Sequence, residues 1–188
     1  MMKDIKTKAA IFPMPVLMIG TYNEDGSVDV MNAAWGMMLD MDRIVLNLTE
    51  THKTVKNIKR NKAFTVSLAD RKHIIEADYF GIVSANSIPN KFEKSGMTAS
   101  KSVKVDAPII NEFPVCMECE FIEYQDSDTG CGVIGKIVNV KADSKVLDED
   151  GNVDAGKLNA LIYDPFKHNY YVTGEKVGKA FSEGRNLK

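Results

Sequence analysis

The sequence has few cysteines and no large excess of either charge, and each of these features excludes a class of protein. Its 188 residues include three cysteines, too few for a disulfide scaffold, so we expect a reducing, cytoplasmic compartment. Lys and Arg total 24 against 26 Asp and Glu, which leaves no surplus of cations for phosphate backbones, and nucleic acid is not an expected partner.

Long hydrophobic runs are also missing. The run from Ala9 to Gly20 follows three lysines and imitates a secretory signal, but Pro13 and Pro15 interrupt it and no small-residue cleavage pattern follows. No segment reaches the roughly 18 to 20 apolar residues that span a bilayer, so we expect no membrane association. Hydrophobic residues at 44% and charged residues at 27% are typical of a globular chain, and the length predicts a single domain over residues 1–188.

An apolar run at 16–22 and short segments with apolar residues at every second position predict strands. These segments are 16–22, 28–31, 43–48, 64–68, 115–121 and 133–140, with a closing strand at 170–172. Asp25-Gly26 predicts a hairpin turn between the first two, and further turns are expected at 125–130 and 148–151. On the strand at 115–121, Glu118 and Glu120 should face water.

Helical spacing and helix-end residues predict three helices between these strands. They are 51–61, 72–80 with Gly81 after its end, and a short helix at 155–161, while 83–102 is expected to form a long ordered loop. Many short strands joined by turns predict a mainly β fold, an antiparallel barrel with helices at its rim.

Two motifs resemble well-known sites in the wrong context. Residues 130–135 spell G-x-G-x-x-G, but the β-branched residues after them predict a strand, so a hairpin turn is favoured over a dinucleotide site. Cys116 and Cys119 form C-x-x-C inside a strand, where an odd separation places the two thiols on opposite faces. We therefore expect a packing role for both, and no metal site.

Thr51-His52-Lys53-Thr54 follows a strand and opens a helix. The unpaired N–H groups and positive dipole of a helix start can hold an anion, and Lys53 with the two threonines can donate further hydrogen bonds. The alternative is that Thr51 only caps the helix and Lys53 is solvated.

Met31 to Gly36 contains the only tryptophan, Trp35, beside the small residues Ala33 and Ala34. Small residues let a ligand approach the backbone, and an indole can pack against an aromatic ring. The alternative is that Trp35 belongs to the core or to an interface.

Several of these segments, in this order and spacing, resemble the flavin reductase-like FMN-binding family, particularly its flavoredoxin branch. The resemblance is carried by Asn32-Ala33-Ala34-Trp35-Gly36, Thr51-His52-Lys53-Thr54 with Asn57-Ile58, Ala77-Asp78-Tyr79-Phe80-Gly81 with Ser84, Asn90-Lys91-Phe92, Ala107-Pro108 and Gly178-Lys179-Ala180-Phe181. It implies an antiparallel, Greek-key split β-barrel that forms a homodimer and binds FMN near the subunit interface.

The matched positions imply a set of cofactor-binding residues. Asn32, Ala33, Ala34 and Trp35 would border the ring, Thr51, His52, Lys53 and Thr54 the phosphate, and Ser84, Ala85, Asn86 and Lys91 would complete the pocket. Lys91 would offset phosphate charge or polarise the flavin. Phe166, Tyr170 and Tyr171 either cover the flavin or belong to the core.

The resemblance leaves three functions open. The first is an NAD(P)H-dependent flavin reductase, in which NADH or NADPH reduces bound FMN; no catalytic residue of the protein is expected, because the flavin supplies the chemistry. The second is an electron carrier between redox-protein partners, since the chain has no room for a nicotinamide domain. The third is a flavin-binding or interaction module without redox activity.

Overall fold

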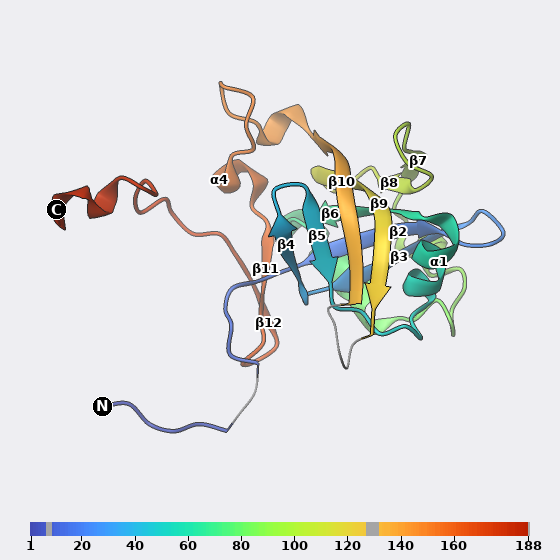
Figure 1. The fold of residues 1–188 in the computed structure, drawn as a ribbon, viewed down its shortest axis with the longest axis horizontal. Coiled ribbons are helices and arrows are strands. Elements are labelled where there is room, and N and C mark those ends of the chain that lie inside the picture. Colours follow the sequence, from blue (N-terminus) through green and yellow to red (C-terminus); the bar gives the residue numbers. More distant parts are fainter. Residues whose placement is uncertain (7–8, 127–131, 188) are drawn as a thin grey trace.

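A computed structural model describes residues 1–6, 9–126 and 132–187. Its main feature is a seven-stranded sheet in the order β3-β2-β6-β9-β10-β5-β4, in which the paired neighbours run antiparallel and which curls on itself (Figure 1). The strands are β2 (Leu17–Tyr22), β3 (Val28–Ala33), β4 (Gly36–Asp40), β5 (Arg43–Leu46), β6 (Ala63–Leu68), β9 (Val115–Gln125) and β10 (Gly132–Ala142). The predicted mainly β class and the six predicted strands of this sheet are confirmed.

The inner face of this sheet forms a core with α1 (Lys53–Asn61). Ile19, Leu46 and Phe64 are fully buried there, and Val55 and Ile58 of the helix pack against them. The period of two in the strands and the spacing of three in the helix therefore place apolar side chains on facing surfaces.

Two smaller sheets flank the large one. In the first, β11 (Leu161–Asp164) pairs with β1 (Met14–Pro15) on one side and β12 (Asn169–Val172) on the other. The second pairs β7 (Ala99–Lys101) with β8 (Pro108–Ile110). The strand predicted at 170–172 is confirmed as β12, but it pairs with β11 outside the seven-stranded sheet and so does not close that sheet.

The helices differ from the sequence-based expectation mainly in their limits. They are α1, α2 (Ile74–Ile82), α3 (Lys91–Ser95) and α4 (Ala155–Leu158), with 3-10 turns η1 (Arg71–His73), η2 (Ser144–Val146) and η3 (Glu183–Leu187). Gly81 lies inside α2 rather than after it, and α4 stops at Leu158 because Leu161 begins β11. The expected loop at 83–102 contains α3 and β7.

The face of β9 that was expected to be wet is partly covered. Glu118 is fully buried and accepts hydrogen bonds from Ser102 Oγ and Asn139 Nδ2. The connection between β7 and β8 covers this face, since Ser102 and Ala107 are buried too. Glu120 is exposed as expected.

The two described cysteines lie in β9 as free, buried thiols. Cys119 belongs to the core beneath the sheet, whereas Cys116 pairs with Ser67 and lies outside that cluster, in agreement with opposite faces. Burial raises the pKa of both thiols, which suits a packing role. The predicted turn at 125–130 and most of the G-x-G-x-x-G segment lie outside the described residues, although β10 begins at Gly132.

Within the described residues, no helix combines the length and the apolar composition that a membrane crossing requires.

Candidate functional site

A small cleft of about 150 Å³ lies where β3, the start of α1 and the segment from α2 to α3 meet. We call it the polar cleft. Seven of the predicted cofactor-binding residues line it: Asn32, His52, Lys53, Thr54, Ser84, Ala85 and Lys91. The fold thus brings together side chains from four segments of the chain that the sequence could only propose as neighbours.

The start of α1 faces this cleft without a side-chain cap. His52 occupies the N-cap position in an extended conformation, and its side chain makes no capping hydrogen bond. Thr51 is therefore not the cap, and that part of the alternative interpretation was wrong. The first N–H groups of the helix and its positive end are therefore suited to an anion.

His52 contributes an unsatisfied atom to the cleft. Its Nδ1 is buried, with no hydrogen-bond partner among the described residues. Burial lowers the pKa of the imidazole, and the charge of Lys91 lowers it further. A neutral imidazole can donate or accept one hydrogen bond at each nitrogen according to its tautomer, so a ligand in the cleft can satisfy this atom.

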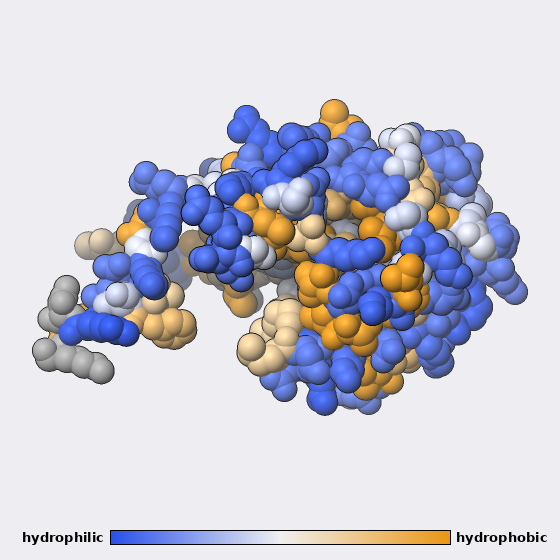
Figure 2. Space-filling view, turned by 90° about the horizontal axis from the view of Figure 1, so that it is seen from above, coloured by the Kyte–Doolittle hydropathy of each residue, from blue (hydrophilic) through white to orange (hydrophobic). Residues whose placement is uncertain are grey.

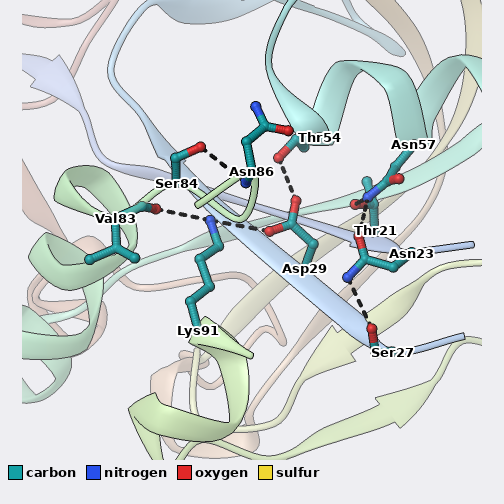
Figure 3. Close-up of polar contacts among 10 residues, drawn as sticks. All are labelled: Thr21, Asn23, Ser27, Asp29, Thr54, Asn57, Val83, Ser84, Asn86 and Lys91. Carbon is teal, nitrogen blue, oxygen red and sulfur yellow. Dashed lines mark hydrogen bonds and ion pairs between the residues drawn. The ribbon is translucent and has the colours of Figure 1, made fainter. Parts of the chain in front are cut away.

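A buried ion pair connects Lys91, which lines the polar cleft, to Asp29, which does not (Figure 3). Lys91 Nζ lies 3.1 Å from Asp29 Oδ1, close enough for an ion pair but without the alignment of a hydrogen bond. Asp29 Oδ2 accepts a hydrogen bond of 2.7 Å from Thr54 Oγ1, and Lys91 Nζ donates one of 3.3 Å to the carbonyl of Val83. The pair joins β3, α1 and α3 at one point.

This pair changes the roles expected for two residues. The charge of Lys91 is already balanced by Asp29, so it is not available as a full positive charge for a phosphate. The proton of the Thr54 hydroxyl is likewise committed to Asp29, which leaves its backbone N–H for a ligand. Asp29 was missed, although a carboxylate between Val28 and Val30 in an apolar strand is a signal of a buried charge.

Two other predicted cofactor-binding residues, Thr51 and Asn86, lie beside the polar cleft. Asn86 Nδ2 donates a hydrogen bond of 3.4 Å to the carbonyl of Thr51, and the N–H of Asn86 donates to Ser84 Oγ at 3.2 Å. Thr51 itself is exposed and lines none of the described clefts. Asn86 lines a neighbouring open cleft of about 660 Å³, and Lys53 and Ala85 lie at the boundary of the two.

A third cleft, of about 580 Å³, begins at the other end of the segment 32–35. We call it the apolar cleft. Its lining is apolar except for Asn47: Ala9, Ala10, Ile11, Pro13, Met14, Pro15, Ala34, Trp35, Gly36, Met37, Val45 and Asn47. Trp35 is 48% exposed, with its ring 6.3 Å from that of Tyr163, so it is not a core residue.

The segment 32–35 therefore separates the two clefts. Asn32 lines the polar cleft, Ala33 is buried in the core, and Ala34 and Trp35 line the apolar cleft. This arrangement places the polar cleft, lined by an uncapped helix start, next to the apolar cleft.

Contacts to α2 fix Asn32 at the boundary. Asn32 Nδ2 donates a hydrogen bond of 2.8 Å to the carbonyl of Ala77, and Tyr170 Oη donates one of 3.0 Å to Asp78 Oδ1. Burial, followed by the hydrogen bond to Asp78, raises the pKa of Tyr170 to about 12. Tyr170 and Asp78 thus hold the C-terminal sheet against α2 beside the polar cleft, a role that their sequence context did not reveal.

Comparison with known proteins gives one family and one fold. The family model described as flavin reductase like domain matches residues 9–167. The solved structure of flavoredoxin from Desulfovibrio vulgaris (Miyazaki F) is 33% identical, with a TM-score of 0.93 over 98% of this chain and 100% of that one. Flavoredoxin from Methanosarcina acetivorans is 23% identical, with a TM-score of 0.89 and both chains wholly covered.

Among curated proteins, one from Aquifex aeolicus is 24% identical over 183 residues, which cover 92% of this chain and 87% of that protein. The structural likenesses confirm the predicted split β-barrel.

Proposed function

Because this chain belongs to the flavin reductase-like family, we propose that it binds FMN and passes electrons through it. The observation that supports this best is the pairing of the polar cleft with the apolar cleft on either side of residues 32–35. A flavin phosphate and a flavin ring need these two environments side by side.

The residues of the polar cleft fit the phosphate end of FMN. The first N–H groups of α1, the ammonium of Lys53 and the hydroxyl of Ser84 would hold the phosphate oxygens. The unpartnered Nδ1 of His52 would gain a hydrogen bond from the same ligand. Because Asp29 already balances Lys91, Lys53 and the helix end are left to offset the phosphate charge.

The residues of the apolar cleft fit the ring. Ala34 leaves the backbone accessible, and the half-exposed indole of Trp35 offers a flat surface. When bound, FMN would supply the acceptor for a hydride or for single electrons. The part of the protein is to anchor the phosphate, orient the ring and exclude water from it, which requires no catalytic side chain of its own.

For the reductant we propose NADH or NADPH, so that the protein acts as an NAD(P)H-dependent flavin reductase. The other candidate, an electron carrier between redox proteins, is supported by the likeness to a protein named flavoredoxin. With FMN added, the first function requires faster oxidation of NADH or NADPH than free FMN gives. No acceleration with either nucleotide, together with reversible bleaching of bound FMN by dithionite, would leave the carrier function.

The phosphate site can be tested by titrating the protein with FMN and following flavin fluorescence. Replacing Lys53 by Gln should weaken FMN binding about 10- to 100-fold, because a hydrogen bond to a charged group contributes about 1.5 to 3 kcal/mol. Lys56→Gln is the matched control, since Lys56 is exposed on the same helix and lines none of the described clefts. Equal affinities of the two variants would contradict the assignment, and a colourless protein that binds no FMN would refute the function.

We also propose that the protein works as a homodimer in the cytoplasm. The free thiols of Cys116 and Cys119 are consistent with a reducing compartment. Side chains on and beside β4 support the dimer: Met37, Met38, Leu39 and Met41 are 66%, 47%, 50% and 93% exposed. An exposed apolar patch on an edge strand is typical of an interface, and sedimentation equilibrium would detect the dimer.

A further inference from the structure

After Thr173, whose hydroxyl donates a hydrogen bond of 3.1 Å to the carbonyl of Ala155 in α4, residues 174–187 extend away from the sheets (Figure 1). We call residues 174–187 the C-terminal segment. In the space-filling view it is part of a separate lobe, with a hollow between that lobe and the body (Figure 2). Its apolar side chains are nearly fully exposed: Val177 at 92%, Phe181 at 98% and Leu187 at 93%. Apolar side chains exposed to this extent are typical of a segment that packs against another surface.

The C-terminal segment is nevertheless folded on itself around Phe181. Glu183 Oε1 accepts a hydrogen bond of 2.9 Å from the N–H of Lys179, and Arg185 Nε donates one of 3.1 Å to the carbonyl of Phe181. Phe181 adopts a left-handed backbone with φ of 62°, which is unfavourable for a large side chain and persists where surrounding contacts impose it. Within the described part of its own chain, only contacts to the backbone, such as that of Arg185, hold this conformation, because the side chain itself is 98% exposed.

A receiving surface of matching chemistry lies on the body. The apolar cleft opens beside β4, on the side of the molecule from which both terminal segments extend (Figure 1). Its rim carries Trp35 and Met37, which are 48% and 66% exposed. The cleft is thus open where an apolar cover would complete it.

We propose that the C-terminal segment of a second copy lies across the open side of the apolar cleft and packs Phe181 against Trp35 and Met37. The inference rests on the homodimer proposed above and adds that each copy completes the other's ring site. A second copy is favoured over the same chain because β12 directs the segment away from its own body, while a partner of the same sequence necessarily carries both surfaces. The exchanged segment would exclude water from the ring, which an open cleft does not do.

The exchange can be tested in the full-length protein with a photo-crosslinking residue, p-benzoylphenylalanine, at position 181. Isotopically heavy and light chains are mixed before irradiation, and cross-linked peptides are identified by mass spectrometry. We expect heavy–light peptides that join position 181 to residues 9–15 or 34–39. The same probe at Val103, which is 83% exposed in the connection between β7 and β8 on the far side of the body, should give no such product.

Each other outcome has a definite meaning. A dimer whose cross-links from position 181 stay within one chain, or reach other residues of the partner, would overturn the exchange and leave the homodimer standing. A monomer at all concentrations would overturn both, while FMN binding, measured separately, would still test the proposed cofactor.

A second variant tests the energetic role of the aromatic ring. Phe181→Ser should raise the dissociation constant of the dimer at least 10-fold and weaken FMN binding with it, whereas Val103→Ser should change neither. An unchanged dimer with unchanged FMN affinity in Phe181→Ser would count against the exchange.

Discussion

At the scale of single residues, the strongest constraint on the site is the buried pair of Asp29 and Lys91. Both side chains are at most 3% exposed, and they are held by Thr54 and by the carbonyl of Val83. Two charges removed from water stabilise a fold only if they stay paired, and the loss of one partner leaves the other uncompensated. The pair therefore fixes three elements of the polar cleft relative to one another.

Replacing Asp29 by Asn should lower the free energy of unfolding by about 3 to 5 kcal/mol, because it keeps the hydrogen-bonding shape but leaves the charge of Lys91 unpaired. Urea denaturation followed by circular dichroism measures this change. Glu24→Gln, in an exposed turn, should change stability by no more than about 0.5 kcal/mol. A loss below about 1 kcal/mol in Asp29→Asn would mean that the pair does not stabilise the fold.

The pKa of His52 should change when the phosphate of FMN binds. Its pKa is lowered below the ordinary value of 6.5 by burial and by Lys91, so the folded protein binds its proton less readily than the unfolded chain. The resulting stability is present above pH 6.5 and is lost as the pH falls through the folded pKa. A nearby phosphate favours the charged imidazole, so FMN should raise this pKa.

NMR titration of the imidazole signals with and without FMN measures this shift, and His52→Asn identifies the His52 signal. An identical midpoint in both titrations would place the phosphate elsewhere.

At the scale of elements, β10 packs closely against the core ring of Phe64 at Gly135. A Cβ at Gly135 would lie 2.4 Å from Phe64 Cζ, a ring in the middle of the core. Gly135→Ala should therefore lower the free energy of unfolding by about 1 to 3 kcal/mol through overpacking, as measured by thermal and urea denaturation. Gly174→Ala is the control, because a Cβ there meets nothing within 4 Å. Similar stabilities of the two variants would show that β10 shifts to make room.

The sequence was most informative about elements whose local pattern and final burial agree. β2 follows from an unbroken apolar run because both of its faces are buried, and α1 follows from helically spaced apolar residues because one of its faces packs against the core. β4 was missed because its Met-Met-Leu run is exposed and shows no alternation, and α3 because its five residues are too few to show a period.

Long-range contacts limit how much of the site could be predicted from the sequence. The burial of Glu118 depends on Ser102 and Asn139, and that of Lys91 on Asp29, and the residues of each group come from distant segments. Local patterns do not encode such pairings. The helix start at 51–54 suggested an anion site from the sequence, but only the fold shows that Asn32 and Ser84 share its cleft.

At the scale of the whole molecule, the two clefts make stability depend on the ligand. A ligand that binds only the folded state stabilises it by an amount set by its concentration relative to its dissociation constant. FMN at 100 times that constant should add about 2.7 kcal/mol to the free energy of unfolding. For a chain of this length that corresponds to a rise in melting temperature of roughly 5 to 10 °C.

Riboflavin separates the contributions of the two clefts, because it carries the same ring without the phosphate. If the phosphate accounts for a 10- to 100-fold difference in affinity, riboflavin at the same concentration should add only about 0.4 to 1.4 kcal/mol. Differential scanning fluorimetry or calorimetry measures both shifts. Equal shifts would mean that the helix start and Lys53 do not bind the phosphate, whereas no shift from riboflavin would mean that the apolar cleft adds little on its own. An intermediate shift requires both clefts to act on one ligand, as their position on either side of residues 32–35 predicts.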